Sequence, residues 1–292
     1  MYFTARLKSN KEKRCIGAAE SPNPAGPFKP SGTGPLICPD NDDTVIDPCG
    51  YIDNPKSLTS DSQRKSKRSA QGENPPNQRA DCATTSTDAE NGDGEHYLLY
   101  RLRSKPNNHD RIMLQQLTPS GLDKQPNSPP TELLAATAED GWVSEAPSLL
   151  RASDGTYVLF FSTHGWETVK YTVSVATSKT LKGGGGGGGG EGGWKRKGDL
   201  LNTGILQGVT GGKNTGPGGA DVLFGMGGKK DVFGMVFHAA KGKDRLGERQ
   251  MWTAAVEVKG GEVRLLGKGK GEDGGEGGDG GEGGEGGGVK GK

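Results

Sequence analysis

The chain has 292 residues, and its 37 Lys and Arg nearly balance its 36 Asp and Glu, which gives a formal net charge of +1. Proteins that bind nucleic acid usually carry a clear basic excess, so this balance argues against a nucleic-acid partner. No stretch approaches the ~18 apolar residues of a membrane-spanning helix, and no apolar signal-peptide segment follows Met1. The sequence therefore predicts no nucleic-acid partner, no membrane partner and no export signal within this chain.

Three stretches are too polar or too rich in glycine to join a packed core. Residues 54–92 contain one Leu and no aromatic residue, which is too little apolar surface to offset the entropy of ordering them. Glycine dominates residues 183–193, and Gly, Glu, Asp and Lys dominate residues 267–292. We predict a disordered insertion, a glycine-rich loop and a disordered tail, with one folded domain over residues 1–266.

The remaining apolar runs are short, rich in aromatic and branched residues, and preceded by turn residues, as is typical of β-strands. They include YLLYRL at 97–102, TYVLFFS at 156–162 and VFGMVFH at 232–238. No segment keeps a helical period over three turns. The glycine-rich segment 208–219 is predicted to form turns rather than a phosphate-binding loop, because no helix follows it. An all-β domain is the prediction.

The same succession of strand, polar loop, strand and turn recurs along the chain. It occupies residues 1–28, 97–122, 157–183 and 235–261. In three of these four cases another strand-like run comes first, and those runs contain Asp47, Glu145 and Asp221. Four strands repeated in this way are typical of the blades of a β-propeller.

The acidic residues of these first strands are expected to meet. In a propeller the blades surround a central channel, so the starts of their innermost strands converge although they lie far apart in the sequence. Asp47 and Glu145 are then expected to face each other. Pro48, Pro147 and Pro217 suit the same positions, because a missing N–H costs little where one edge of a strand faces a channel.

Two carboxylates in a partly dry cavity cannot both ionise freely, because like charge and desolvation raise at least one pKa. A carboxyl group that stays protonated near neutral pH suits a general acid, and glycoside hydrolysis commonly uses such a pair. The structural alternative is two strand-start carboxylates that accept hydrogen bonds from turn N–H groups.

Four motifs at these positions resemble glycoside hydrolase family 43, and most closely its fungal arabinan- and xylan-active members. They are VIDPCGYID, VSEAPSLLRASDGTYVLFFS, NTGPGGADV and ERQMWTAAVEV, and the resemblance runs from about Met1 to Leu266. It implies a five-bladed β-propeller that cleaves α-L-arabinofuranosyl or β-D-xylosyl linkages with inversion. It also implies a carbohydrate substrate and an extracellular location.

The resemblance assigns roles to individual residues. Glu145 matches the general acid, and Asp47 matches the carboxylate that raises the pKa of the acid and orients it. Arg249 matches an arginine that binds hydroxyls of the sugar, where its planar fork of donors suits vicinal oxygens. The alternative for Arg249 is a surface ion pair with Glu248.

Two tryptophans lie close to the acid in the sequence. Trp142 precedes Glu145, and Trp166 lies in the loop after the second strand of the same blade. From these positions either indole could stack on a sugar ring. The alternative is that both only cover the rim of the propeller.

One departure from the family concerns the general base, an Asp on the first strand of the first blade. The opening strand MYFTARL matches the second half of the second blade, so we expect about three and a half of the five blades and no general base. Since inversion needs a base to activate water, this N-terminally truncated chain is expected to be nearly inactive. The alternative function is a non-catalytic propeller that binds carbohydrate or protein.

A second departure concerns a central ion. Many family members place a His in the GPG segment to help hold it, whereas Gly218, Gly219 and Ala220 follow Pro217 here. A structural calcium is the one candidate cofactor, and this departure argues against it; Asp221 and His238 are the nearby polar candidates.

Cysteine usage leaves two alternatives open. The four cysteines have no CxxC spacing, which argues against a zinc site. Cys15 and Cys38 flank one polar segment and are expected to form a disulfide if the protein folds in an oxidising compartment. Free buried thiols are the alternative.

Overall fold

A computed structural model of the chain describes residues 1–41, 43–54, 94–105, 107–183, 193–212, 214–225, 229–242, 248–266 and 290–291. The predicted insertion, glycine-rich loop and tail fall almost entirely outside these ranges, and Cys82 lies outside them too.

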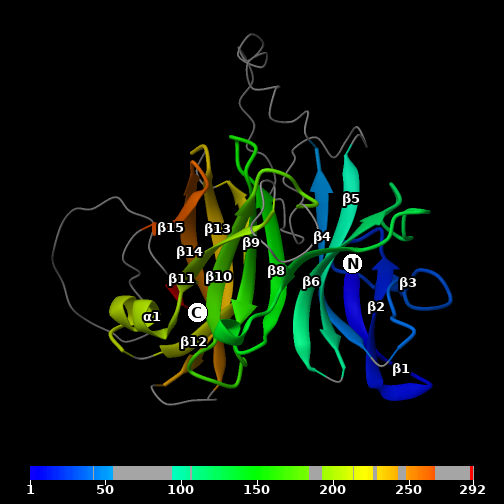
Figure 1. The fold of residues 1–292 in the computed structure, drawn as a ribbon, viewed down its shortest axis with the longest axis horizontal. Helices are drawn as coiled ribbons and strands as arrows, with labels where there is room; N and C mark the ends of the chain where they lie inside the picture. Colours follow the sequence, from blue (N-terminus) through cyan, green and yellow to red (C-terminus); the bar gives the residue numbers. More distant parts are fainter. Residues whose placement is uncertain are drawn as a thin grey trace, which may run out of the picture.

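The described residues form four antiparallel sheets that follow one another along the chain (Figure 1). The first sheet contains β1 (Tyr2–Leu7), β2 (Asn10–Glu20) and β3 (Lys29–Pro30). The second contains β4 (Thr44–Asp53), β5 (Glu95–Ser104), β6 (His109–Leu117) and β7 (Thr131–Ala135). The third contains β8 (Ser144–Arg151), β9 (Tyr157–Thr163), β10 (Thr172–Ser178) and β11 (Lys195–Leu201). The fourth contains β12 (Asn214–Gly225), β13 (Val232–Lys241), β14 (Arg249–Lys259) and β15 (Glu262–Leu266), and β16 (Lys290–Gly291) pairs with β14.

The sheets pack face to face, and alternation along a central strand fills both of its faces. On β5, Leu98 and Tyr100 join the core shared with the first sheet, whereas Leu99 joins the core shared with the third. On β9, Phe161 belongs to the core between the second and third sheets, and Phe160 to the core between the third and fourth. This explains why the apolar runs are nearly continuous rather than alternating.

The second, third and fourth sheets share one design, in which β4–β7, β8–β11 and β12–β15 pair in chain order and the first strand lies on the inside. The innermost strand β8 contacts β4 on one side and β12 on the other, so these sheets fan around the line where their first strands meet. The predicted all-β propeller class is confirmed. The total of five blades stays a prediction.

A bulge interrupts each innermost strand directly before a proline. The residues before Pro48, Pro147 and Pro217 all have positive φ, at 54° for Asp47, 48° for Ala146 and 57° for Gly216. The pairing register shifts at the same places, between Ile46 and Cys49, Glu145 and Ser148, and Thr215 and Gly218. A bulge bends its strand and redirects side chains. Because proline has no N–H to leave unpaired, it suits this position.

The turn prediction for residues 208–219 was wrong at both ends. The helix α1 (Thr203–Thr210) covers its beginning, and β12 covers its end from Asn214. Asn202 caps the helix by accepting a hydrogen bond from the Ile205 N–H at 3.0 Å, and Gly211 ends it in the left-handed conformation. Asn202 and Gly211 are residue types that favour the two ends of a helix, so these signals were present in the sequence. The eight residues of the helix are too few to show a helical period. A single 3-10 turn, Ala138–Asp140, precedes β8.

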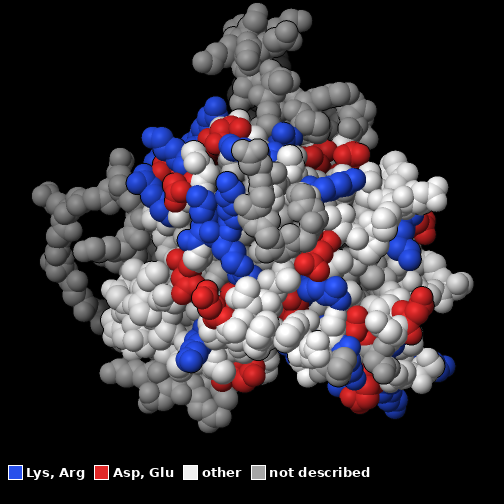
Figure 2. Space-filling model, viewed as in Figure 1, with Lys and Arg blue, Asp and Glu red and all other residues white. Residues whose placement is uncertain are grey.

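The surface carries charges of both signs, and Figure 2 shows acidic and basic side chains side by side on one face. None of the helices in the described ranges has the length and apolar character needed to span a membrane.

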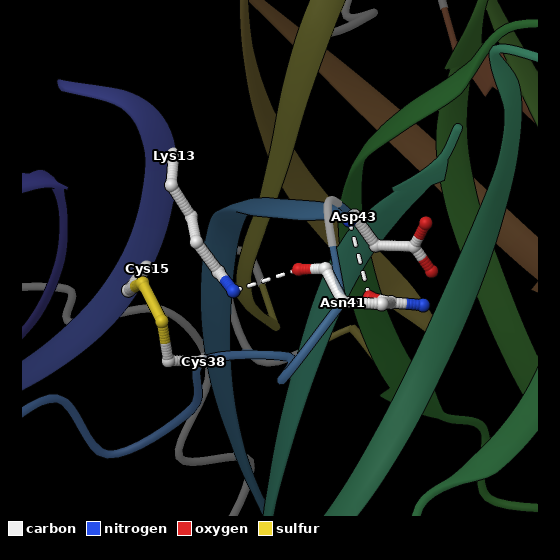
Figure 3. The surroundings of a disulfide bond; sticks show 5 residues. All are labelled: Lys13, Cys15, Cys38, Asn41 and Asp43. Carbon is white, nitrogen blue, oxygen red and sulfur yellow. Dashed lines mark hydrogen bonds between the residues drawn. A yellow bond between two sulfur atoms is a disulfide. The ribbon is translucent and has the colours of Figure 1, made fainter. Parts of the chain in front are cut away.

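A disulfide ties the approach to β4 onto the first sheet (Figure 3). Cys15 on β2 is bonded to Cys38, with their Cα atoms 4.7 Å apart, as the sequence suggested. Lys13 donates to the carbonyl of Asn41 at 2.7 Å, and the Asn41 side chain accepts from the Asp43 N–H at 3.1 Å. The segment that leads into β4 is therefore held to β2 along its length.

Replacing both Cys15 and Cys38 by alanine is expected to lower the free energy of unfolding. The disulfide spans 23 residues, and closing a loop of this size typically stabilises a protein by about 2–4 kcal/mol. Urea denaturation without reductant measures the change. Equal midpoints and slopes for variant and parent would contradict the expectation.

Candidate active site

A pocket of about 600 Å³ lies where the four sheets meet, and each sheet contributes to its wall. The first sheet gives Arg14, and the second gives Asp47, Arg101 and Arg103. The third gives Glu145 and the connection from β9 to β10, with Trp166, Glu167 and Tyr171. The fourth gives Gly219 and His238.

The structure brings Asp47 and Glu145 together in this pocket. The Asp47 carboxylate accepts a hydrogen bond at 3.0 Å from the N–H of Ala146, the residue after Glu145, across 99 positions of sequence. Asp47 lies in the bulge of β4, and Glu145 lies at the bulge of β8. Burial raises the pKa of Asp47, and the Ala146 N–H and the Arg101 charge oppose that rise.

Glu145 is a buried carboxyl group with a partner on each oxygen. The residue is 7% exposed. Its Oε1 accepts from the Tyr171 hydroxyl at 2.8 Å, and its Oε2 forms a short ion pair with Arg101. Burial raises the pKa of Glu145, and the nearby Asp47 charge adds to the rise, whereas Arg101 and the Tyr171 hydrogen bond lower it. The net effect is a raised pKa, as a general acid needs.

A fully buried aspartate supports Arg101 from behind. Asp110 on β6 is 0% exposed and lies 2.7 Å from Arg101 Nη2. It also accepts from Arg103 at 2.8 and 3.1 Å. Arg101 thus bridges the second sheet and the carboxyl group of Glu145 on the third. Because a buried charge is costly unless it is paired, Asp110 is the counterion that makes the buried Arg101 tolerable.

Arg249 lies beside the pocket and behind two of its lining residues. Its Nε donates to Nδ1 of His238 at 2.5 Å, and its Nη1 donates to the Trp166 carbonyl at 3.0 Å. Its Nη2 donates to the carbonyls of Gly216 and His238 at 2.6 and 3.2 Å. The guanidinium also lies 5.3 Å from the centre of the Tyr171 ring. Its donors are therefore directed to protein groups, and direct binding of a sugar by Arg249 stays a prediction.

The two tryptophans occupy different settings. Trp166 lines the pocket and is 55% exposed. Trp142 is not among the lining residues; it stacks on His109, with ring centres 4.0 Å apart and planes 7° from parallel. Trp166 thus has the better position to meet a sugar ring, and sugar stacking by either residue stays a prediction.

The described residues leave a central calcium as a prediction. They contain no group of three or more His, Cys, Asp or Glu placed to hold a metal. Of the two polar candidates, His238 already accepts from Arg249 through Nδ1, and Asp221 accepts from the Ser148 hydroxyl at 2.9 Å. A side chain on Gly219 would also collide with the His238 ring.

Sequence reasoning missed three residues that shape the site: Arg101, Asp110 and Tyr171. It named His238 only as a polar candidate for a central ion. The clearest available signal was Arg101, a charged residue within the apolar run YLLYRL. Its partner Asp110 begins the next strand, but no spacing rule connects that pair to Glu145. Tyr171 comes directly before β10, and no sequence motif marks it.

Replacing Asp110 by asparagine is expected to lower the free energy of unfolding by about 3–5 kcal/mol, because Arg101 and Arg103 lose their buried counterion. Glu132→Gln is the matched control, since Glu132 pairs with Arg111 at 3.6 Å in a partly exposed setting and should cost less than about 1 kcal/mol. Urea denaturation compares the two. Equal losses would show that Asp110 carries no special structural role.

The sequence matches the family described as Glycosyl hydrolases family 43 over residues 83–251, more than half of the chain. No curated protein gives a significant match. The family match confirms the resemblance, and its range contains the motifs VSEAPSLLRASDGTYVLFFS and NTGPGGADV in full.

Several solved structures share this fold. A thermostable family-43 glycoside hydrolase superposes with a TM-score of 0.62 at 17% identity, over 91% of this chain and 70% of its own. An endo-1,4-beta-xylanase from Bacteroides thetaiotaomicron VPI-5482 gives a TM-score of 0.56 at 19% identity, over 90% and 74%. An alpha-L-arabinanase from Cellvibrio cellulosa complexed with arabinohexaose gives 0.52 at 15% identity, over 90% and 72%. Together with the family match, this common fold leads to one conclusion: the chain belongs to glycosyl hydrolases family 43.

Proposed function

We propose that this pocket hydrolyses arabinose- or xylose-containing plant polysaccharides or oligosaccharides with inversion, with Glu145 as general acid and Asp47 as the group that raises its pKa. The observation that carries the proposal is the meeting of these two carboxylates in one pocket, with Glu145 buried and held through both oxygens. The similarity to a xylanase and an arabinanase supports the substrate class.

The partners of Glu145 suit an acid that must give up its proton during the reaction. Before transfer, burial and the Asp47 charge favour the protonated form. After transfer to the leaving oxygen, the ion pair with Arg101 and the Tyr171 hydrogen bond stabilise the carboxylate that remains. Burial thus favours the acid form before the transfer, and the two partners favour the carboxylate after it.

The general base limits the rate in this proposal. An inverting enzyme needs a second carboxylate about 6.5–9.5 Å from the acid to activate water. Besides Asp47 and Glu145, the acidic residue among those described as lining the pocket is Glu167, which is exposed in the loop between β9 and β10. A loop residue is held less firmly than one on a strand, so we expect slow turnover. This same feature favours the alternative, a propeller that binds carbohydrate or protein without cutting it.

An extracellular location is proposed as well. The Cys15–Cys38 disulfide supports folding in an oxidising compartment, because disulfides persist in secreted proteins and are rare in the cytosol.

Hydrolysis of arabinan, arabinoxylan and nitrophenyl glycosides tests the proposed function, with Glu145→Gln as the decisive variant. We expect Glu145→Gln to lower kcat by about 10²–10⁴-fold on natural linkages, because the leaving oxygen is no longer protonated. Dinitrophenyl glycosides, whose leaving group needs little protonation, should lose much less.

Calorimetric titration with an oligosaccharide serves as the control, since the variant should still bind it. Sugar binding by the parent chain without cleavage of any substrate would favour the non-catalytic alternative. Unchanged turnover by Glu145→Gln would exclude Glu145 as the acid.

Two variants should shift the pH dependence of kcat/KM in opposite directions. Activity requires protonated Glu145, so the alkaline limb follows its pKa. Asp47→Asn removes a charge that raises this pKa, and the limb should move to lower pH. Tyr171→Phe removes a hydrogen bond that lowers the pKa, and the limb should move to higher pH. Each shift should be on the order of one pH unit. Shifts of the same sign would contradict the assignment.

A further inference from the structure

His238 lines the pocket from the fourth sheet and has no role in the acid step described above. Its side chain lines the pocket from β13, and its ring is 5.9 Å from that of Tyr171, whose hydroxyl bonds Glu145. The side chain of Tyr171 thus lies between His238 and the proposed general acid. The question is what its imidazole presents to a substrate.

The hydrogen bond from Arg249 decides the tautomer. A guanidinium can only donate, so Nδ1 of His238 must accept and carries no hydrogen. A neutral imidazole then carries its single hydrogen on Nε2. Burial and the neighbouring Arg249 charge lower the pKa of His238 to about 4, which agrees with a neutral ring over the working range of most hydrolases.

The Nε2 edge faces a position without a side chain. Gly219 of β12 lines the same pocket, and a Cβ placed on it would collide with Nε2 and the adjoining ring carbon of His238. Among the described residues, no hydrogen-bond partner of Nε2 is present. The absence of a side chain at 219 therefore leaves room for this edge of the imidazole, in a pocket that both residues line.

The ring cannot readily turn away. Arg249 holds both Nδ1 and the main-chain carbonyl of His238, and the same guanidinium donates to the carbonyls of Gly216 and Trp166. Tyr171 covers the ring at an interplanar angle of 25°. A donor whose direction is set before binding loses little entropy when a ligand arrives.

From this geometry we propose that His238 is a further substrate-positioning residue, which donates a hydrogen bond from Nε2–H to a hydroxyl of the sugar bound beside Glu145, and that Arg249 acts through it. The proposal rests on the function proposed above. A neutral donor suits a hydroxyl, and it adds no positive charge that would lower the pKa of the acid. It also gives Arg249 a positioning role in place of direct contact.

The tautomer can be tested without any substrate. Long-range proton–nitrogen correlation spectra of protein labelled with 15N-histidine distinguish a hydrogen on Nε2 from one on Nδ1. The chain has four histidines, so assignment by single substitution is practical. We expect His238 to be neutral with hydrogen on Nε2 at pH 6. Hydrogen on Nδ1, or a doubly protonated ring, would overturn the proposal.

The contact itself is tested with paired variants in the Glu145→Gln background, where binding is measured without cleavage. His238→Gln can place an amide N–H near the position of Nε2, whereas His238→Asn reaches only as far as Nδ1. Affinity for linear arabino- and xylo-oligosaccharides should stay within about threefold for His238→Gln and fall about tenfold for His238→Asn, the worth of one hydrogen bond. With Glu145 restored, the loss in His238→Asn should appear in KM rather than kcat.

His96→Gln, a substitution on β5 outside the pocket lining, serves as the control and should leave affinity unchanged. If sugars bind and His238→Asn binds as tightly as the parent, the role of His238 is wrong while the proposed function stands. If the protein neither binds nor cleaves any of these sugars, the role of His238 and the proposed function are both wrong. Should His238→Asn not fold, the tautomer measured on the parent still decides.

Discussion

The site depends most on the buried ion pairs that the carboxylate of Asp110 forms with two arginines. It is fully enclosed and holds the guanidinium groups of Arg101 and Arg103. Arg101 in turn reaches across to Glu145 on the neighbouring sheet. The β5–β6 hairpin thus determines the position and the charge environment of a carboxyl group on β8. Buried charges are costly unless they are paired, so the Asp110–Arg101–Glu145 ion pairs favour this one arrangement of the two sheets.

Two series of side-chain contacts hold Glu145, and each series includes an arginine. One oxygen leads through Arg101 to Asp110, and the other leads through the Tyr171 hydroxyl to the ring that Arg249 covers. Asp47 and Glu145 lie at the bulges of their innermost strands. The fourth sheet therefore contributes through Arg249 and His238, although neither residue touches Glu145. Bringing the sheets together is what forms the site.

The strand order and the meeting of Asp47 and Glu145 were predictable from the sequence, because both follow from a repeated pattern of turns, apolar runs and prolines. The partners of Glu145 were not, since they depend on which strand of one sheet lies beside which strand of the next. Arg101 and Asp110 looked like two charges of one hairpin, and Tyr171 looked like an ordinary strand residue. Helix α1 was missed because eight residues show no period. The hydrogen bonds of Arg249 could not be predicted, because they depend on where three main-chain carbonyls lie in the folded chain.

The central claim is that Glu145 meets the bond to be cleaved in the pocket it shares with Asp47. A crystal structure of the Glu145→Gln variant with a bound arabino- or xylo-oligosaccharide tests this most directly. The account predicts a glycosidic oxygen within hydrogen-bond reach of the side chain at position 145, roughly 2.6–3.2 Å. A sugar bound with its glycosidic oxygens facing away from that side chain, or bound outside this pocket, would contradict it.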